Sequence, residues 1–175
     1  MKNKILSVDW AFHNTGIALY DIETKTITTT IWAIPNKVKI EWWDISFYEV
    51  VKKQFNLFYY NTCKPIDGIK QILVEVGFGK VDKMSLFYAW FYNLWLDKKA
   101  TVMFINSSEW IRNFLKINRL RDLKKGKDKE LLKELFYKRF NNVPRNFSQD
   151  EIDAVMMLLN TYPGLEIKEI KRIVI

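Results

Sequence analysis

The 175-residue sequence predicts an α/β fold, a mixed five-stranded sheet whose first three strands are antiparallel and whose two faces carry helices. Two observations predict it. Segments with β and helical patterns follow one another in the order βββαβαβαα, which combines an antiparallel start with βαβ crossovers. The fractions of apolar and charged residues, 49% and 27%, are typical of a globular protein with a core. Because no internal repeat or domain boundary is evident, we expect a single domain over residues 1–175.

Three β-rich segments open the chain. Lys4–Trp10 is rich in β-formers, Thr15–Tyr20 follows a turn-like Phe-His-Asn, and Thr26–Ile34 is dense in β-branched side chains. We expect these three segments to form consecutive strands of an antiparallel meander, because the connections between them are short.

Helix and strand signals alternate in the middle of the chain. Apolar residues at helical spacing predict a helix over Trp42–Tyr60. Pro65 and Gly68 then break the chain before a strand at Gln71–Val76. Met84–Leu96 has the length of a helix and is apolar almost all round, so it needs cover on two sides. Its own domain or a two-fold dimer interface could provide that cover.

Helices dominate the C-terminal part of the sequence. After a short strand at Thr101–Ile105, the polar residues 106–108 offer N-caps for a helix that runs through Leu115. A basic loop leads to a charged amphipathic helix over Asp128–Phe140. The last helix covers residues 148–160, and a Pro-Gly pair follows it.

The formal net charge of +8 lies in one segment. Residues 112–145 contain twelve Lys or Arg and four Asp or Glu, whereas the rest of the chain contains sixteen residues of each sign. Such a concentrated basic excess indicates a surface for a polyanion, and we rank nucleic acid above a membrane surface. No window approaches the ~18 consecutive apolar residues of a membrane-spanning helix, so we expect no membrane partner.

Cysteine and histidine are too scarce for several kinds of site. Cys63 and His13 are the single residues of their types, which excludes a disulfide framework, cysteine zinc sites and sites that need two histidines. Any bound metal is therefore expected to be a hard cation held by carboxylates. Because the N-terminus has no apolar run of signal-peptide length, we expect a cytoplasmic location.

Four acidic residues stand at strand ends or in the first turn of the last helix, where sites form in α/β proteins. They are Asp9, Glu75, Asp150 and Asp153. Asp150 and Asp153, at i and i+3, share one helix face. Glu151 has a simpler explanation, because it completes an S-x-x-E capping box. Each of the four could be a buried acid paired with Lys or Arg, but together they would supply the oxygen ligands that two divalent cations need for phosphodiester hydrolysis.

Three motifs occur in order along the chain. Asp9 followed by Thr15-Gly16 forms D-x5-T-G, residues 74–78 (VEVGF) place an acid at a strand end, and residues 150–154 (DEIDA) open the last helix. From Lys4 to Asn160 the sequence therefore resembles the RuvC-like Holliday junction resolvases of the RNase H-like superfamily, and among them the phage-encoded branch. It departs from the family's pattern after Asp9, where Trp-Ala replaces Pro-Gly.

The resemblance implies an RNase H-like fold and two Mg2+ ions in each active site, for which Mn2+ could substitute. It implies that the ligands of these ions are Asp9, Glu75, Asp150 and Asp153. It also implies a homodimer that presents two sites to a four-way DNA junction. If the protein is phage-encoded, it would act in the cytoplasm of the bacterial host.

Contacts with DNA are expected mainly from the basic segment, although residues 119–129 could also be a solvated loop and helix face. The resemblance to the resolvases implies lysines near the cleaved phosphate, and Lys127 and Lys129 are the candidates for this position. Phe78, between two glycines, could wedge between bases or simply anchor its loop. His13 is expected to be structural or solvent-exposed, because a metal-bound hydroxide makes a general base unnecessary. The expected DNA-binding residues are Phe78, Lys80, Arg119, Arg121, Lys124, Lys125, Lys127 and Lys129.

These observations favour a metal-dependent DNA endonuclease that resolves four-way junctions by hydrolysing one phosphodiester per subunit. Two alternatives stay open. The first is a non-catalytic protein that binds branched DNA through the basic surface. The second is another RNase H-like nuclease that acts on RNA–DNA hybrid, because four carboxylates alone do not select the substrate.

Overall fold

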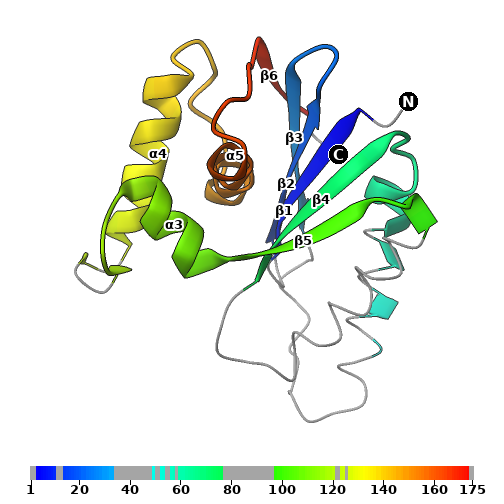
Figure 1. The fold of residues 1–175 in the computed structure, drawn as a ribbon, viewed down its shortest axis with the longest axis horizontal. Helices are drawn as coiled ribbons and strands as arrows, with labels where there is room; N and C mark the ends of the chain where they lie inside the picture. The colour runs from blue at the N-terminus through cyan, green and yellow to red at the C-terminus, as the bar shows by residue number, and fades with distance from the viewer. Residues whose placement is uncertain are drawn as a thin grey trace.

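The computed structural model describes residues 3–10, 14–33, 59–76, 97–120, 123–124 and 126–173, together with positions 49, 52, 53, 56 and 57. These residues form a six-stranded sheet with the strand order β5-β4-β1-β2-β3-β6 (Figure 1). The strands are β1 (Lys4–Asp9), β2 (Asn14–Asp21), β3 (Thr26–Ala33), β4 (Ile69–Val76), β5 (Thr101–Asn106) and β6 (Glu169–Arg172).

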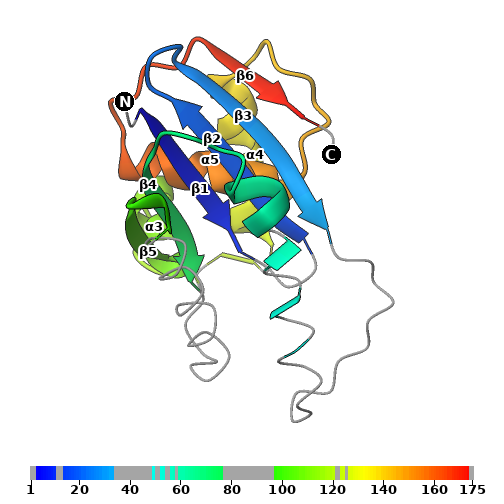
Figure 2. The same cartoon turned by 90° about the vertical axis from the view of Figure 1, so that its right-hand side faces the viewer.

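Within the described residues, the α-helices with defined bounds lie on one face of this sheet (Figure 1). They are α3 (Ser107–Leu115), α4 (Lys127–Arg139) and α5 (Gln149–Thr161). Helix α5 packs directly on β1, β2 and β3, and both α3 and α4 pack on α5. A π-helical turn, η1 (Tyr59–Cys63), lies on the opposite face (Figure 2).

The sheet topology confirms the predicted fold class. Strands β1, β2 and β3 form the expected antiparallel meander. Strands β4 and β5 then join the sheet in parallel, β4 beside β1 and β5 beside β4. The parallel pairing of β4 with β5 is the one expected for a βαβ unit, and the connection at 77–96 lies outside the described residues.

The predicted number of five strands is wrong, because β6 adds a sixth. It pairs in parallel with β3, where Ile27 lies opposite Ile170, and it forms one edge of the sheet (Figure 2). Its four residues, Glu-Ile-Lys-Arg, contain one β-branched side chain and three charges. Such a segment has little strand propensity of its own, so the ladder with β3 determines its conformation.

Two apolar clusters, one on each face, account for the alternation of residues along β1. Leu6 and Val8 point into a cluster on the η1 face, where Tyr59 and Ile66 cover it. Ile5 points into the main core on the α5 face. In α5, the nine consecutive residues 151–159 are all buried, because the sheet, α3 and α4 surround the helix.

The helix predictions are correct where the structure describes them. The three C-terminal helices lie within one or two residues of their predicted bounds. Of the predicted helix Trp42–Tyr60, positions 49, 52, 53, 56 and 57 are described and are helical. The predicted helix Met84–Leu96 lies outside the described residues. In the part of the chain that is described, no helix has the length and apolar character needed to cross a membrane.

Candidate active site

Asp9 and Glu75 occupy the carboxyl ends of two neighbouring parallel strands. β1 and β4 pair in register up to Val8 and Val74, so the next residue of each strand is one of the two acids. Leu73 belongs to the core on the α5 face, and because strand residues alternate between faces, Glu75 points to that face as well. Since neighbouring strands lie about 4.8 Å apart, the sheet presents two adjacent carboxylates beneath α5.

The indole of Trp110 orients the carboxylate of Glu75. Its Nε1 donates a hydrogen bond of 2.9 Å to Glu75 Oε2. Trp110 is 1% exposed and sits in the core between α3 and α5. Asn106 caps α3 by accepting from the backbone N–H of Glu109 at 3.2 Å, which fixes the start of the helix that carries the indole.

The first turn of α5 supplies Asp150 and Asp153. Ser148 is the N-cap, where its hydroxyl accepts from the backbone N–H of Glu151 at 3.2 Å. The Glu151 carboxylate in turn accepts from the backbone N–H of Ser148 at 2.9 Å, which completes the predicted capping box. Gln149 Nε2 donates to Asp153 Oδ1 at 2.7 Å and holds that side chain along the helix.

Two contacts fix α5 against the sheet beside these acids. Gly16, opposite Asp9 in the β1–β2 ladder, lies so close to α5 that an added Cβ would be 1.9 Å from the carbonyl oxygen of Asp150. This close approach requires a glycine. On the same face, Ser7 Oγ donates a buried hydrogen bond of 2.7 Å to the carbonyl of Ala154.

The four carboxyl groups act on one another electrostatically. Burial and the charges of the other three acids raise the pKa of Asp9 to about 9. Burial raises the pKa of Glu75 to about 7 and that of Asp153 to about 6, although a hydrogen bond opposes each shift. Burial also raises the pKa of Asp150. The fold has therefore gathered like charges at one place, at a cost that a bound cation would offset.

The positive charge of Lys129 reaches this cluster from the first turn of α4. It lowers the pKa of each of the four carboxyl groups, Asp9, Glu75, Asp150 and Asp153. Neighbouring Lys127 is instead engaged by Glu130, whose Oε2 lies 2.9 Å from its Nζ. Of the two lysines that the sequence singled out, Lys129 is therefore the one that faces the acids electrostatically.

The acids fit a hard divalent cation by their chemistry. Their donors are carboxylate oxygens, which Mg2+ and Mn2+ prefer, and their mutual repulsion is the kind that such an ion relieves. Among the described residues, no three acidic, histidine or cysteine side chains are close enough to hold an ion as they stand. Coulombic interactions act over longer distances than the 2.0–2.6 Å of metal–oxygen bonds. The acids can therefore shift one another's pKa values although they are not yet at metal-binding distance.

Comparison with solved structures places this arrangement in a known fold. RuvC of Thermus thermophilus, in its own structure, gives a TM-score of 0.57 at 10% identity. The same protein in complex with a Holliday junction substrate gives a TM-score of 0.56 at 7% identity. Each alignment covers 90% of this chain and 92% of RuvC. The chain has the fold of RuvC.

The similarity to RuvC is structural, because the sequence identity is 10% or less. No family model matches the chain, and no curated protein matches its sequence significantly. The RuvC fold nevertheless confirms the RNase H-like sheet and its helices that the motif order predicted. The phage origin stays a prediction.

The four predicted acids interact electrostatically, whereas only half of the predicted DNA-binding residues are described. Arg119 and Lys124 are exposed in the connection between α3 and α4, and Lys127 and Lys129 are exposed at the start of α4. Five predicted or discussed positions lie outside the described residues. They are Phe78, Lys80, Arg121, Lys125 and His13.

Residue-level reasoning missed the side chains that hold the acids in place. For Ser7 a signal existed, because a hydroxyl in an otherwise apolar strand usually marks a buried hydrogen bond. Gly16 was recognised as part of a motif, but its role as the point where α5 touches the sheet depends on tertiary contacts. Trp110 gave no signal, because an aromatic residue in an amphipathic helix is ordinarily part of the core.

Proposed function

We propose that this protein is a Mg2+-dependent DNA endonuclease that resolves four-way junctions. The observation that carries the proposal is the electrostatic interaction of Asp9, Glu75, Asp150 and Asp153 where the carboxyl ends of β1 and β4 meet the first turn of α5 in a RuvC-like fold. Asp153 is buried, the other three acids are half-buried, and all four have raised pKa values. Gathering such groups destabilises a metal-free fold, and metal-dependent phosphodiester hydrolysis would account for their presence.

In this proposal the acids from two elements hold the ions between them. Asp9 and Glu75 contribute from the sheet, and Asp150 and Asp153 contribute from α5. When bound, divalent ions activate water as a nucleophile and stabilise the leaving oxygen of the phosphodiester. Trp110 keeps Glu75 oriented, and Gln149 does the same for Asp153.

Lys129 is proposed to face the phosphate at the cleavage position. Its charge already acts on all four carboxyl groups, so a phosphate bound beside them would lie within its reach. The exposed Arg119 and Lys124 extend the basic surface away from the acids, where they would contact neighbouring backbone phosphates.

A four-way junction is the proposed substrate because the RuvC of Thermus thermophilus has been seen bound to one on the same fold. A homodimer that presents two sites to the junction is proposed because the resemblance to the resolvases implies it. The helix Met84–Leu96, for which either a dimer interface or cover by its own domain was expected, lies outside the described residues.

The test is cleavage of a labelled four-way junction by purified protein in Mg2+ or Mn2+. We expect cleavage by the wild type, and losses of several orders of magnitude in Asp9→Asn and Asp153→Asn, because each removes a ligand charge and leaves the shape unchanged. Asp67→Asn is the matched control, since Asp67 is an exposed loop carboxylate just before β4, at the opposite end of that strand from Glu75. Full activity in Asp9→Asn would contradict the assignment.

Substrate choice is tested with the same preparations on a junction, a linear duplex and an RNA–DNA hybrid. Preferential cleavage of the junction supports the proposal. Cleavage of the hybrid alone would replace it with an RNase H activity. Tight junction binding without cleavage in either metal would instead support the non-catalytic alternative. Size-exclusion chromatography with light scattering measures the oligomeric state independently.

A further inference from the structure

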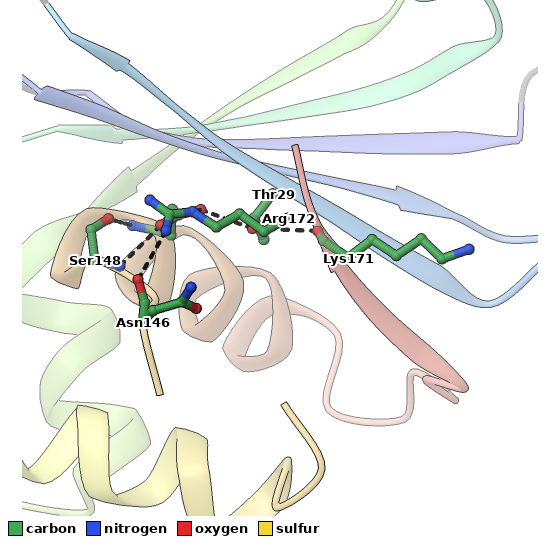
Figure 3. A network of polar contacts seen from close by, with 6 residues as sticks. Thr29, Asn146, Ser148, Lys171 and Arg172 are labelled. Atoms are coloured by element: carbon green, nitrogen blue, oxygen red, sulfur yellow. Dashed lines mark hydrogen bonds and ion pairs between the residues drawn. The ribbon is translucent and has the colours of Figure 1, made fainter. Parts of the chain in front are cut away.

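Glu151 lies between two of the proposed metal ligands, yet its carboxylate points away from them toward the far edge of the sheet. The side chain is 0% exposed. Its Oε1 accepts from Thr29 Oγ1 at 3.0 Å and pairs with Arg172 Nε at 3.0 Å, while its Oε2 accepts from the backbone N–H of Ser148 (Figure 3). One buried carboxylate therefore connects β3, β6 and the start of α5.

Arg172 completes this network from the last residue of β6. Besides Glu151, its guanidinium donates through Nη1 to the carbonyl of Asn146 at 3.0 Å, just before α5 begins (Figure 3). The strand behind it is anchored by the ladder with β3 and by the backbone N–H of Ile173, which donates to the carbonyl of Thr29 at 2.8 Å. Arg172 thus contacts the first turn of α5 at Glu151 and the segment before the helix at Asn146, from a strand that is itself paired with the sheet.

Helix capping alone does not require this arrangement. A capping box needs a Glu or Gln at the N3 position, and neither full burial nor an ion pair is part of it. The ion pair itself contributes little net stability, because the Arg172 side chain is 29% exposed and solvent screens it. Glu151 is fully buried and also hydrogen-bonded to Thr29 and Ser148, so the pair provides a fixed geometry between the sheet edge and the turn that carries Asp150 and Asp153.

The first turn of α5 has a particular need for such a restraint. Asp150 and Asp153 repel each other and both raise the pKa of Asp9, close to the point where Gly16 allows the helix backbone to touch the sheet. Repulsion tends to push the turn away from the sheet in the absence of a cation. The contact at Gly16 only limits how closely the turn approaches, and the hydrogen bond from Ser7 holds α5 at Ala154, just beyond the turn. The ion pair with Arg172 acts on the turn itself and resists its outward movement.

We infer that Arg172, acting through Glu151, is a positioning residue that holds Asp150 and Asp153 at the separation from Asp9 and Glu75 that divalent metal binding needs. The inference rests on the proposed function. It gives strand β6, which the sequence did not predict, a role in positioning the metal ligands.

The test measures Mg2+ binding by thermal shift and Mg2+ dependence of junction cleavage in Arg172→Met. We expect the Mg2+ concentration at half-effect to rise about 10-fold or more in both measurements, since residues that orient metal ligands typically change metal affinity 10- to 100-fold. The KM for DNA should stay within about twofold of wild type, because Arg172 is expected to act on metal ligands and not on the DNA. Lys171→Met is the matched control, since Lys171 pairs with Glu169 and has no side-chain contact with α5 among the described interactions.

A double variant separates positioning from stability. Arg172→Met alone leaves Glu151 as an unpaired buried charge, which could lower the melting temperature. Adding Glu151→Gln removes that charge and keeps a capping side chain. We expect the double variant to regain melting temperature without regaining Mg2+ affinity. Recovery of wild-type Mg2+ dependence in the double variant, or its retention in Arg172→Met, would overturn the inference.

The same measurements distinguish failure of the inference from failure of the proposed function. A wild-type protein that neither binds Mg2+ or Mn2+ nor cleaves DNA overturns both. A wild type that does both, with Arg172→Met responding identically to metal, overturns the role of Arg172 alone and leaves the four acids in place.

Discussion

Substituting Gly16 by alanine should displace the first turn of α5. A Cβ at this position would lie 1.9 Å from the carbonyl oxygen of Asp150 and 2.2 Å from its carbonyl carbon, whereas ordinary contacts begin at 3.4 Å. The neighbours are backbone atoms, so no side chain can rotate out of the way. Relieving the clash therefore requires a relative movement of about 1.5 Å between α5 and β2, directly at the proposed metal ligands.

Two effects of different size follow from this movement. Overpacking a tightly packed core typically costs about 1–3 kcal/mol, and in a protein of this length each kcal/mol lowers the melting temperature by about 2–4 °C. A misplacement of about 1 Å in a catalytic group can reduce the rate about 100-fold. We therefore expect Gly16→Ala to unfold a few degrees earlier and, at a temperature where it is fully folded, to cleave about 100-fold more slowly.

The assay pairs thermal unfolding with single-turnover cleavage at saturating Mg2+, so that lost stability is not mistaken for lost activity. Gly164→Ala is the matched control, because a Cβ at Gly164 meets nothing within 4 Å. Cleavage by Gly16→Ala at the wild-type rate would show that the contact between α5 and β2 does not set the geometry of the acids.

Three further predictions concern the charges of the site. In the metal-free folded protein Asp9 has a pKa of about 9, whereas in the unfolded chain it ionises near pH 4, so the stability that its protonated form provides below pH 4 is lost as the pH rises toward 9. Urea unfolding should therefore show a free energy of unfolding about 3 kcal/mol lower at pH 8 than at pH 6. The Asp9→Asn variant should show a weaker dependence of this free energy on pH. Trp110→Phe removes the hydrogen bond that lowers the pKa of Glu75, and it should raise the Mg2+ concentration at half-maximal cleavage about 10-fold. An unchanged Mg2+ titration would show that Trp110 does not orient the Glu75 carboxylate for metal binding. Lys129→Met should slow cleavage about 100-fold and reduce the salt dependence of DNA binding by about one unit of slope, whereas the exposed Lys133→Met on the same helix should leave the cleavage rate unchanged.

The elements that could be predicted from the sequence are those with strong local patterns. The meander of β1 to β3 follows from β-branched segments joined by short turns, and α5 follows from its cap and apolar stripe. Strand β6 could not be predicted, because Glu169–Arg172 is a strand only through its pairing with β3. Its identity depends on residues more than a hundred positions away, which no local pattern contains.

In the candidate site, too, local patterns predicted some residues and tertiary contacts determine the others. The four acids could be named from the sequence, because strand ends and a helix start place them at positions that the topology brings together. The residues that hold them, among them Ser7, Trp110 and Arg172, act through contacts between distant elements. Charged and aromatic side chains of this kind look like surface or core residues until their partners are known.

The complete burial of residues 151–159 in α5 restricts which changes in chain length this protein tolerates. A helix turns by about 100° per residue, so deleting or inserting one residue between the cap and Asp153 would rotate that acid away from the sheet. The same change downstream would leave Asp153 in place but turn the apolar stripe that packs on β1, β2 and β3. Length variation in this fold is therefore expected in the connections around α5 and never within it.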